Sequence, residues 1–320
     1  MLTKIAQFIK QNDNFVIIPH RNPDGDCLGS ACALLLGLRG MGKTAYISLP
    51  EEPSSRLAFL WAEDYRTPDN FKYDSCIAVD VAATYMMGDL YESIFAKTDN
   101  TACIDHHGTN SGYASVNAVV PSAAAAGEVV FDLLKNHLGC VMTKEICTCL
   151  YSAISSDTGC FRYSNTTATT HEIAAYLIDR DIDAGTIVRI LFETKSLSSV
   201  RIHSDIVNTM EFYCHGKVCV VTVDQPMLDK YGMTFDMVDD YASLPRNIEG
   251  VEVGVFLKVK GENEVKASLR SNAYADVSAI AASLGGGGHI RAAGVTVNDS
   301  PDNAKKLIIG AIEKVIGTAE

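Results

Sequence analysis

The sequence predicts an α/β fold with two domains, the first built on a mainly parallel sheet and the second smaller. Short apolar runs alternate with helical stretches through the first half of the chain, which is typical of parallel strands joined by crossover helices that cover both faces. Further along, strand-like runs follow one another with helices interspersed, which indicates a second α/β domain. A chain of 320 residues is long enough for two such cores.

Each element is expected where its pattern occurs. In the first domain, strands are expected at 15–18, 44–48, 75–79 and 101–104, and helices at 26–40, 123–138, 144–155 and 168–179. A helical stretch over 183–213 has a polar interruption at 195–199, where the domains are expected to join. In the second domain, strands are expected at 217–223, 251–259 and 265–271, and helices at 234–242, 276–284 and 302–316. The expected boundaries are a first domain at 1–190, a helical linker at 191–212 and a second domain at 213–320.

Composition and charge exclude several classes of function. A net charge of -12 argues against a protein that binds long nucleic acid over its whole surface. No apolar run approaches the roughly 18 residues of a membrane helix, and the first fifteen residues do not resemble a secretory signal. The 10 cysteines are scattered through apolar runs without a CxxC pair, as expected for free thiols in a reducing cytoplasm. We therefore expect a cytoplasmic protein that binds any phosphate substrate through a local basic site or a metal.

The segment FVIIPHRNPDGDCLGS places His20, Asp24 and Asp26 directly after an apolar strand. Two interpretations are open from this segment alone. Asn, Pro, Asp and Gly are common turn residues, and Asp26 is a suitable cap for the helix that follows. The same side chains are also suitable metal ligands.

Three further clusters favour the metal site. Asp80 follows the strand at 75–79, Asp105, His106 and His107 follow the strand at 101–104, and Asp157 follows the helix at 144–155. Ligands of parallel sheets bind beyond the carboxyl ends of the strands, and three of the four clusters lie directly after strands. Turn chemistry alone does not explain this repetition.

The ligand types also indicate the metal and the chemistry. Carboxylates combined with imidazoles suit a hard-to-borderline divalent ion. Mn²⁺ fits best, Co²⁺ is a suitable substitute, Mg²⁺ fits less well, and no cysteine is positioned to favour zinc. Two such ions roughly 3.5–4 Å apart stabilise the attacking and leaving oxygens of phosphoryl transfer and activate a water. A two-metal phosphoryl-transfer site is therefore expected.

The second domain contains a glycine-rich segment, GGGGHIRAAG, at residues 285–294. Glycine runs are usually flexible linkers with polar neighbours, but this one lies between an apolar helix and a strand-like run. Its position indicates a backbone that approaches a ligand closely, with amides free to bind anionic oxygen. The candidate substrate-binding residues of this segment are Gly287, Gly288 and His289. Arg270 and Ser271, at the end of a strand-like run, are further candidates, and Arg246 is a weaker one, but on the residues alone Arg270 fits a solvated strand-end charge better.

These motifs resemble those of the DHH phosphoesterase superfamily in their order and spacing. The matching segments are HRNPDGD at 20–26, Asp80, DHH at 105–107 and SDTG at 156–159, and the glycine-rich segment resembles the signature of the DHHA1 domain. The compact two-domain form is most similar to the nanoRNase/pAp phosphatase branch. The resemblance implies an enzyme that hydrolyses very short oligoribonucleotides and 3′-phosphoadenosine 5′-phosphate (pAp).

The resemblance also implies a role for each residue. One ion would be held by His20, Asp24 and Asp80, and the other by Asp26, Asp80, His106 and Asp157, with Asp80 bridging. Asp105 would orient a neighbouring imidazole, and His107 would contact the scissile phosphate. The residues named above in the second domain would bind the substrate, and a cleft between the domains would limit its length. A homodimer is implied by the resemblance alone.

The sequence departs from the family pattern at 123–126. Relatives tend to have hydroxyl residues at this helix start, where this chain has four alanines, so a phosphate contact from hydroxyls is not expected. Two alternatives to the pAp and oligoribonucleotide activity remain at this stage. One is a phosphodiesterase for cyclic di-AMP or its linear product pApA, and the other is a catalytically silent nucleotide-binding module.

Overall fold

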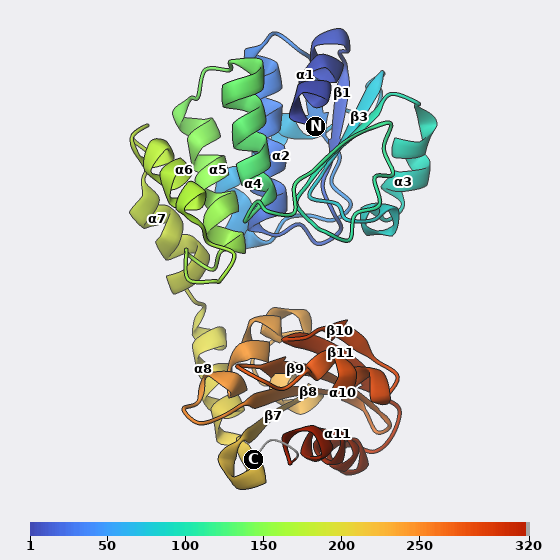
Figure 1. Ribbon diagram of the computed structural model, residues 1–320, viewed down its shortest axis with the longest axis vertical. Coiled ribbons are helices and arrows are strands. Elements are labelled where there is room, and N and C mark those ends of the chain that lie inside the picture. Colours follow the sequence, from blue (N-terminus) through green and yellow to red (C-terminus); the bar gives the residue numbers. More distant parts are fainter. Residues whose placement is uncertain (318–320) are drawn as a thin grey trace. The chain divides into compact units, whose positions relative to one another are not determined.

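The computed structural model describes residues 1–317 and divides into two compact units, Met1–Thr194 and Lys195–Glu320 (Figure 1). The first unit contains a five-stranded sheet in the order β2-β1-β3-β4-β5, and every neighbouring pair is parallel. The second unit contains a separate six-stranded sheet in the order β10-β11-β9-β8-β7-β6. In that sheet only β7 and β8 pair in parallel. The predicted fold class is confirmed.

The first unit follows the predicted alternation of strands and helices. Its strands are β1 (Phe15–Ile18), β2 (Ala45–Ile47), β3 (Ser75–Val79), β4 (Thr101–Asp105) and β5 (Val116–Val119). Its helices are α1 (Leu2–Gln11), α2 (Gly25–Gly40), α3 (Leu90–Ser93), α4 (Ala126–Asp132), α5 (Lys144–Asp157), α6 (Ala168–Ile178) and α7 (Ala184–Val188). Two π-helical turns, η5 (Leu133–Leu138) and η6 (Arg189–Glu193), continue α4 and α7. Short 3₁₀ turns lie at Ser55–Leu60, Glu63–Tyr65, Thr84–Met87 and Phe95–Lys97.

The first sheet is covered on both faces, which explains why its strands are continuous apolar runs. Successive side chains of a strand point to opposite faces. In β1, Phe15 and Ile17 pack into the larger core with the helices, whereas Val16 and Ile18 pack into a smaller core with Phe95. All four β1 side chains are completely buried. A strand buried on both faces requires an unbroken apolar sequence rather than an alternating one.

Helices α2 and α5 pack closely through glycines of α2. A Cβ atom on Gly29 would lie 2.6 Å from the carbonyl oxygen of Cys149, and one on Gly25 would lie 2.5 Å from Oγ of Ser156. The absence of side chains at these two positions lets the start of α2 lie against the end of α5. The residues at those two helix ends, including Asp26 and Asp157, are thereby brought together.

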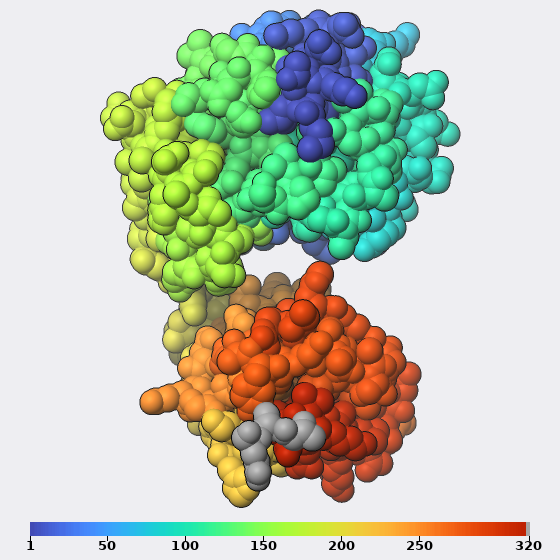
Figure 2. All heavy atoms as spheres, viewed as in Figure 1, coloured from blue at the N-terminus to red at the C-terminus, as the bar shows by residue number. Residues whose placement is uncertain are grey.

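Helix α1 lies beside β5 and η5, as the dark blue and green atoms in Figure 2 show. Strand β5 was not predicted. Its sequence, VNAV, is short, and only Ala118 is fully buried because the strand forms an edge of the sheet. A short edge strand gives a weak hydrophobic signal.

The second unit has the strands β6 (Glu211–Tyr213), β7 (Val218–Asp224), β8 (Val253–Gly261), β9 (Glu264–Ser271), β10 (Gly287–His289) and β11 (Ala292–Val297). Its helices are α8 (Leu197–Asn208), α9 (Gln225–Asp229), α10 (Val277–Ser283) and α11 (Pro301–Ile316). The helix expected at 234–242 is a 3₁₀ segment, Asp236–Ser243, followed by another at Pro245–Asn247. Within residues 1–317, no helix is long and apolar enough to cross a membrane.

Helix α8, which lies in the range expected as a linker, packs on the second sheet. Its Ile202 and Ile206 are fully buried in a core with Val221, Val223 and Phe256 of β7 and β8. The helical stretch predicted over 183–213 is interrupted at Thr194 and gives way to strand β6 at its end.

Candidate active site

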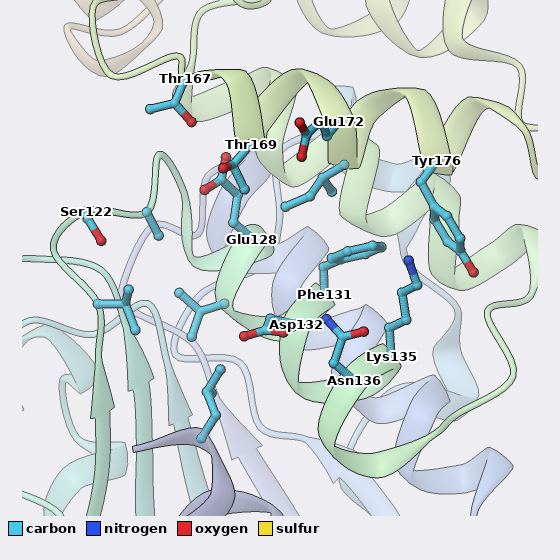
Figure 3. A pocket seen from close by; sticks show the side chains of 15 residues that line it. Ser122, Glu128, Phe131, Asp132, Lys135, Asn136, Thr167, Thr169, Glu172 and Tyr176 are labelled. Carbon is cyan, nitrogen blue, oxygen red and sulfur yellow. Dashed lines mark hydrogen bonds between the residues drawn. The ribbon is translucent and has the colours of Figure 1, made fainter.

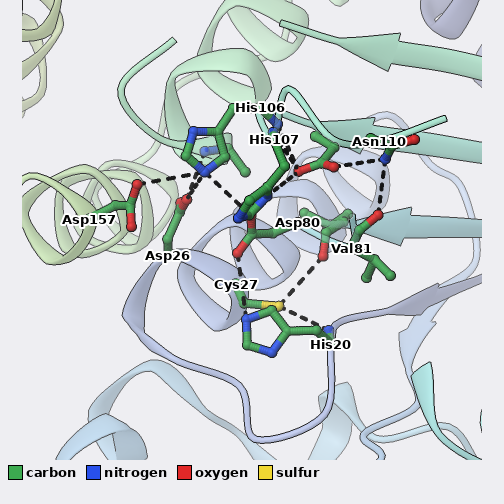
Figure 4. A network of polar contacts seen from close by, with 12 residues as sticks. His20, Asp26, Cys27, Asp80, Val81, His106, His107, Asn110 and Asp157 are labelled. Atoms are coloured by element: carbon green, nitrogen blue, oxygen red, sulfur yellow. Dashed lines mark hydrogen bonds and ion pairs between the residues drawn. The ribbon is translucent and has the colours of Figure 1, made fainter. Parts of the chain in front are cut away.

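Four of the other predicted metal ligands of the first unit gather around Asp80, as Figure 4 shows for His20, Asp26, His106 and Asp157. Nε2 of His20 lies 3.6 Å from Oδ2 of Asp80, and Nε2 of His106 lies 3.6 Å from Oδ1. Each oxygen of this carboxylate therefore faces a different imidazole, as a bridging carboxylate requires. Asp80 follows β3 directly and has a φ of 59°, a left-handed conformation that turns the chain sharply at the sheet edge.

The remaining ligands lie on either side of that carboxylate. Nε2 of His20 is 3.9 Å from Oδ1 of Asp24. Nε2 of His106 is 3.7 Å from Oδ2 of Asp26 and 3.6 Å from Oδ2 of Asp157. These distances leave room for an ion between the groups, because they exceed direct hydrogen-bonding contact. The six side chains predicted as ligands thus lie near one another, and their role as metal ligands stays a prediction.

Backbone carbonyls set the orientation of the two ligand imidazoles. Nδ1 of His20 lies 2.7 Å from the carbonyl oxygen of Arg21, and Nδ1 of His106 lies 3.2 Å from that of Ala123. A carbonyl oxygen only accepts hydrogen bonds, so each Nδ1 is the donor and each Nε2 is the nitrogen left for a metal. The Nε2 atoms face the carboxylates, which is the usual arrangement around ligating histidines.

Asp26 has a structural role in addition to its place among the ligands. Its side chain is 1% exposed and accepts hydrogen bonds from the backbone N–H groups of Ala126 (2.7 Å) and Gly127 (2.9 Å). The N-cap residue of α4, Ala125, makes no side-chain hydrogen bond to the start of the helix. Asp26 therefore caps α4 from a distant part of the chain, at the place where relatives were expected to have hydroxyl residues. The first backbone N–H groups of α4 are therefore already hydrogen-bonded to Asp26.

Asp105 orients His107 and lies beneath the ligand shell. Its Oδ1 accepts a hydrogen bond from Nδ1 of His107 (2.8 Å), and its Oδ2 accepts one from Nδ2 of Asn110 (2.7 Å). Burial opposes ionisation of Asp105, but the hydrogen bonds from His107 and Asn110 prevail and lower its pKa. The bond to Asp105 in turn raises the pKa of His107. Asn110 gave no signal in the sequence beyond its position in a polar loop.

The electrostatics of the site fit a divalent cation. Burial, and then the neighbouring Asp157, raise the pKa of Asp26 well above its usual value, and burial with Asp26 does the same for Asp80. Burial also raises the pKa of Asp157. Oδ1 of Asp80 is buried without a hydrogen-bond partner in the described chain. Crowded carboxylates with an unpaired buried oxygen lack positive charge, and a metal ion would supply it.

One neighbour of the site was not foreseen. Sγ of Cys27 lies close to the ligand atoms of His20 and Asp80 and accepts a hydrogen bond of 3.1 Å from the backbone N–H of His20. Burial raises the pKa of the Cys27 thiol well above its usual range, and the thiol donates to the carbonyl oxygen of Val79. A neutral thiol is a poor ligand, because metals bind the thiolate. A bound cation lowers the pKa of a neighbouring thiol, so Cys27 stays among the candidate ligands, and the expectation that no cysteine is placed at the metal site is corrected.

The second unit places two of the predicted substrate residues, His289 and Arg270, on one face of its sheet. His289 pairs with Ala292, Ala292 pairs with Arg270, and Arg270 pairs with Gly254, so these residues form one row. Directly paired residues point to the same face. Arg246 lies against this row, because a Cβ atom on Gly254 would collide with its backbone nitrogen.

The guanidinium groups of Arg246 and Arg270 are suited to an anion. Burial, and then the positive charge of Arg246, lower the pKa of Arg270. Within residues 1–317, no ion pair involves either guanidinium group. Asp239 acts on Arg270 without a direct ion pair, so phosphate binding would relieve the repulsion between the two neighbouring cations.

The other predicted residues of this unit have different surroundings. Ser271 is 1% exposed, and its hydroxyl donates to the carbonyl oxygen of Ile290, so it faces the interior. The glycine run forms strand β10 rather than an open loop, and its Gly288 has a φ of 148°. A Cβ atom on Gly288 would lie 2.5 Å from the carbonyl oxygen of Ala292, whereas one on Gly287 would meet no atom within 4 Å.

Comparison with known proteins agrees with this geometry. Residues 14–154 match the model of the DHH family, N-terminal domain, and residues 215–318 match that of the DHHA1 domain. The bifunctional oligoribonuclease and PAP phosphatase NrnA of Thermus thermophilus is 33% identical, over 98% of this chain and 94% of that protein. The chain belongs to the DHH family of phosphoesterases. It is therefore a hydrolase of phosphate esters, as predicted.

Two other matches show how far the family extends. A crystal structure of an exopolyphosphatase-related protein from Bacteroides fragilis has a TM-score of 0.87 at 23% identity, over 98% of this chain and 95% of that one. This match shows a shared fold. The cyclic-di-AMP phosphodiesterase PdeA of Listeria monocytogenes is 23% identical over 97% of this chain but only 49% of its own length. The DHH match ends before Asp157, the predicted ligand at the end of α5.

Proposed function

We propose that this DHH phosphoesterase hydrolyses very short oligoribonucleotides and pAp with two bound divalent ions, most suitably Mn²⁺. The observation that carries the proposal is the position of Asp80, whose two oxygens face His20 and His106 separately. His20, Asp24 and Asp80 would hold one ion. Asp80 would share the second with Asp26, His106 and Asp157.

The donor set supports a hard-to-borderline ion. It consists mainly of carboxylate oxygens and two imidazole nitrogens, with the single sulfur of Cys27 beside them. Two divalent ions supply positive charge to the phosphate and lower the pKa of a bound water. The chain itself has to hold the phosphate in line with that water.

His107 is the residue best placed to hold the scissile phosphate. Its Nδ1 is engaged by Asp105, so Nε2 is the nitrogen left for a ligand, and its side chain is 41% exposed. The raised pKa of His107 favours the imidazolium form, which donates to a phosphate oxygen and offsets charge in the transition state. We therefore assign His107 to the phosphate and Asp105 to the orientation of His107.

The second unit is proposed to bind the nucleotide through Arg246, Arg270 and His289, with the backbone at Gly287 and Gly288 beside them. A small local cluster of cations in a chain of net charge -12 suits a small anion better than a long polymer. The relative from Thermus thermophilus, which the chain matches over nearly its full length, is named for this pair of activities.

The decisive experiment compares substrates at equal Mn²⁺. The turnover of pAp, of di- to pentaribonucleotides and of cyclic di-AMP is measured for the intact chain and for Asp80→Ala, the metal-site control. We expect pAp and the short oligoribonucleotides to be hydrolysed with a much higher kcat/KM than cyclic di-AMP. Chelation should abolish activity, and Mn²⁺ should restore it better than Mg²⁺ or Ca²⁺. Preference for cyclic di-AMP, or full activity without metal, would contradict the proposal.

The second candidate function is hydrolysis of cyclic di-AMP or pApA. The match to PdeA of Listeria monocytogenes favours it, although this chain spans about half of that protein. A silent nucleotide-binding module is less well supported, because every expected ligand is present at the site. We further propose that the protein acts in the cytoplasm, since the described cysteines are all free thiols, and that it forms a homodimer.

A further inference from the structure

A cavity of about 630 Å³ lies in the first unit (Figure 3), and its lining does not include the proposed metal ligands. It is formed by the connection from β5 to α4, by α4 and η5, and by α6. Its apolar surface includes Val129, Phe131 and Ile173, and polar side chains surround these residues. A cavity of this volume accommodates a small organic molecule.

Glu128 of α4 lines the cavity with a half-satisfied carboxylate. The residue is 6% exposed, and its Oε2 accepts a hydrogen bond of 3.0 Å from the backbone N–H of Ala124. Its Oε1 is buried and has no hydrogen-bond partner within the described chain. An unpaired buried carboxylate oxygen is costly, so a donor supplied by a ligand would stabilise it.

The charges around the cavity select for a cation. Glu128, Asp132 and Glu172 line it, and Lys135 is the basic residue among the lining side chains. The ammonium group of Lys135 lies 3.7 Å from the centre of the Tyr176 ring and is directed to that aromatic face. Three carboxylates repel a nucleotide, whereas a cationic group on an apolar stem matches both the acids and the apolar surface.

A π-helical turn borders the same cavity. Lys135 and Asn136 belong to η5, which interrupts the regular hydrogen bonding at the end of α4. Such turns occur frequently at functional sites because they widen the helix and redirect side chains. This observation is independent of the unpaired oxygen of Glu128.

We propose that this cavity is a second binding site, which takes a primary amine or guanidinium carried on an apolar stem. The cationic group pairs with Oε1 of Glu128, and the stem packs against Phe131 and Ile173. The chemistry of the site differs from that of the phosphate-binding centre, so the ligand is not the substrate.

The cavity is connected to the metal ligands through its own wall. Ala123 lines the cavity, and its carbonyl oxygen accepts the hydrogen bond from Nδ1 of His106. Glu128 belongs to the first turn of α4, whose leading amides bind Asp26. A ligand that holds residues 123–128 in place therefore also holds His106 and Asp26, two proposed metal ligands, through these hydrogen bonds. Because coupling is reciprocal, amine binding raises the affinity for the metal, and the metal raises the affinity for the amine.

Calorimetry on the full chain tests the binding site directly, without any measurement of activity. Hexylamine is titrated into chelator-treated protein, with 1-hexanol and hexanoate as the neutral and anionic matches. We expect hexylamine to bind, and the other two to bind at least about tenfold more weakly. Glu128→Gln should weaken hexylamine about tenfold, because a charge-assisted bond becomes a neutral one. Glu92→Gln, an exposed carboxylate on α3, is the matched control and should have no effect.

A second variant tests the same site if Glu128→Gln fails to fold. Thr169→Trp places a large ring at an exposed position of the cavity rim and should also abolish hexylamine binding. Equal binding of hexylamine, hexanol and hexanoate, or unchanged binding in both variants, would overturn the proposal. Loss of a dimer in Thr169→Trp, with no hexylamine binding to the parent chain, would show a self-association surface and also overturn it. Titration of Mn²⁺ with and without hexylamine tests the coupling, which an unchanged Mn²⁺ affinity would refute.

Discussion

Asp26 is expected to stabilise the protein even when no metal is bound. It accepts two buried backbone N–H groups at the start of α4, as well as the hydroxyl of Ser30. Asp157 is also proposed as a metal ligand, but within residues 1–317 its carboxylate faces His106 and accepts no hydrogen bond. The substitutions Asp26→Ala and Asp157→Ala therefore separate capping of α4 from metal binding.

The magnitude follows from the groups left unpaired. Each buried N–H without an acceptor costs about 1–3 kcal/mol, which gives a loss of about 2–6 kcal/mol for two groups. Removal of a buried carboxylate whose pKa is raised by burial and by Asp157 offsets part of this loss. We expect Asp26→Ala to lower the free energy of unfolding by about 1–3 kcal/mol, within the range known for N-caps and buried bonds. Asp26→Asn should lose less, because its amide oxygen still accepts one N–H.

Urea denaturation in excess chelator measures this difference. The single tryptophan, Trp61, lies in the first unit, so its fluorescence reports the unfolding of that unit. Asp157→Ala should be within about 0.5 kcal/mol of the parent chain, or more stable, because it relieves repulsion among carboxylates. Both variants should lose tight Mn²⁺ binding. Equal stability of the two variants without metal would refute the capping role of Asp26.

Three further predictions concern pH, the glycine run and substrate binding. In metal-free protein, burial and then Asp26 raise the pKa of Asp80 in the folded state. Folding therefore favours the protonated carboxyl group. The stability that Asp80 contributes is fully present below its pKa in the unfolded chain and is lost as the pH rises through its pKa in the folded protein. Mn²⁺ competes with protons for the carboxylate of Asp80. The difference in Tm between Mn²⁺-loaded and chelated protein should therefore widen from about pH 5 to pH 8, and a constant difference would contradict this prediction. Gly288→Ala should weaken pAp binding or destabilise the second unit, because its Cβ atom would collide with the backbone of Ala292. Gly287→Ala should be tolerated. Equal effects of the two substitutions in calorimetry would refute this reasoning. Arg270→Ala should lower kcat/KM for pAp by about one to two decades, with a smaller loss on bis-p-nitrophenyl phosphate and unchanged Mn²⁺ binding. Equal losses on both substrates would show that Arg270 does not hold the nucleotide.

The ligand cluster was predictable because the order of elements determines where parallel strands end. Once 15–18, 75–79 and 101–104 are assigned to one parallel sheet, residues just after them share an edge. His20, Asp80 and His106 meet there for that reason. Only the packing of α5 on α2, which the sequence indicates weakly through glycines, adds Asp157.

Other features depend on contacts that have no local signal. The hydrogen bonds from Asp26 to α4 join residues about a hundred positions apart, and nothing in either segment specifies the other. The glycine run was expected to form an open anion-binding backbone, but it pairs with β11 as a strand. The cavity beside Glu128 arises from the packing of α6 against α4, which periodicity does not determine.

The spread of the proposed ligands along the chain has a consequence for when the protein would acquire the proposed ions. The ligands come from His20 at one end of the first unit to Asp157 near the other. The proposed ligands of one ion, His20, Asp24 and Asp80, are all present once the first 80 residues have been made. The second proposed ion also needs Asp157, which is available only after α5 has been made and has packed against α2. Contacts between such distant segments form late in folding, so capture of the second ion would follow folding of this unit. A nascent chain that ends before α5 would therefore hold one ion at most, and uptake of the second would mark the completion of the unit.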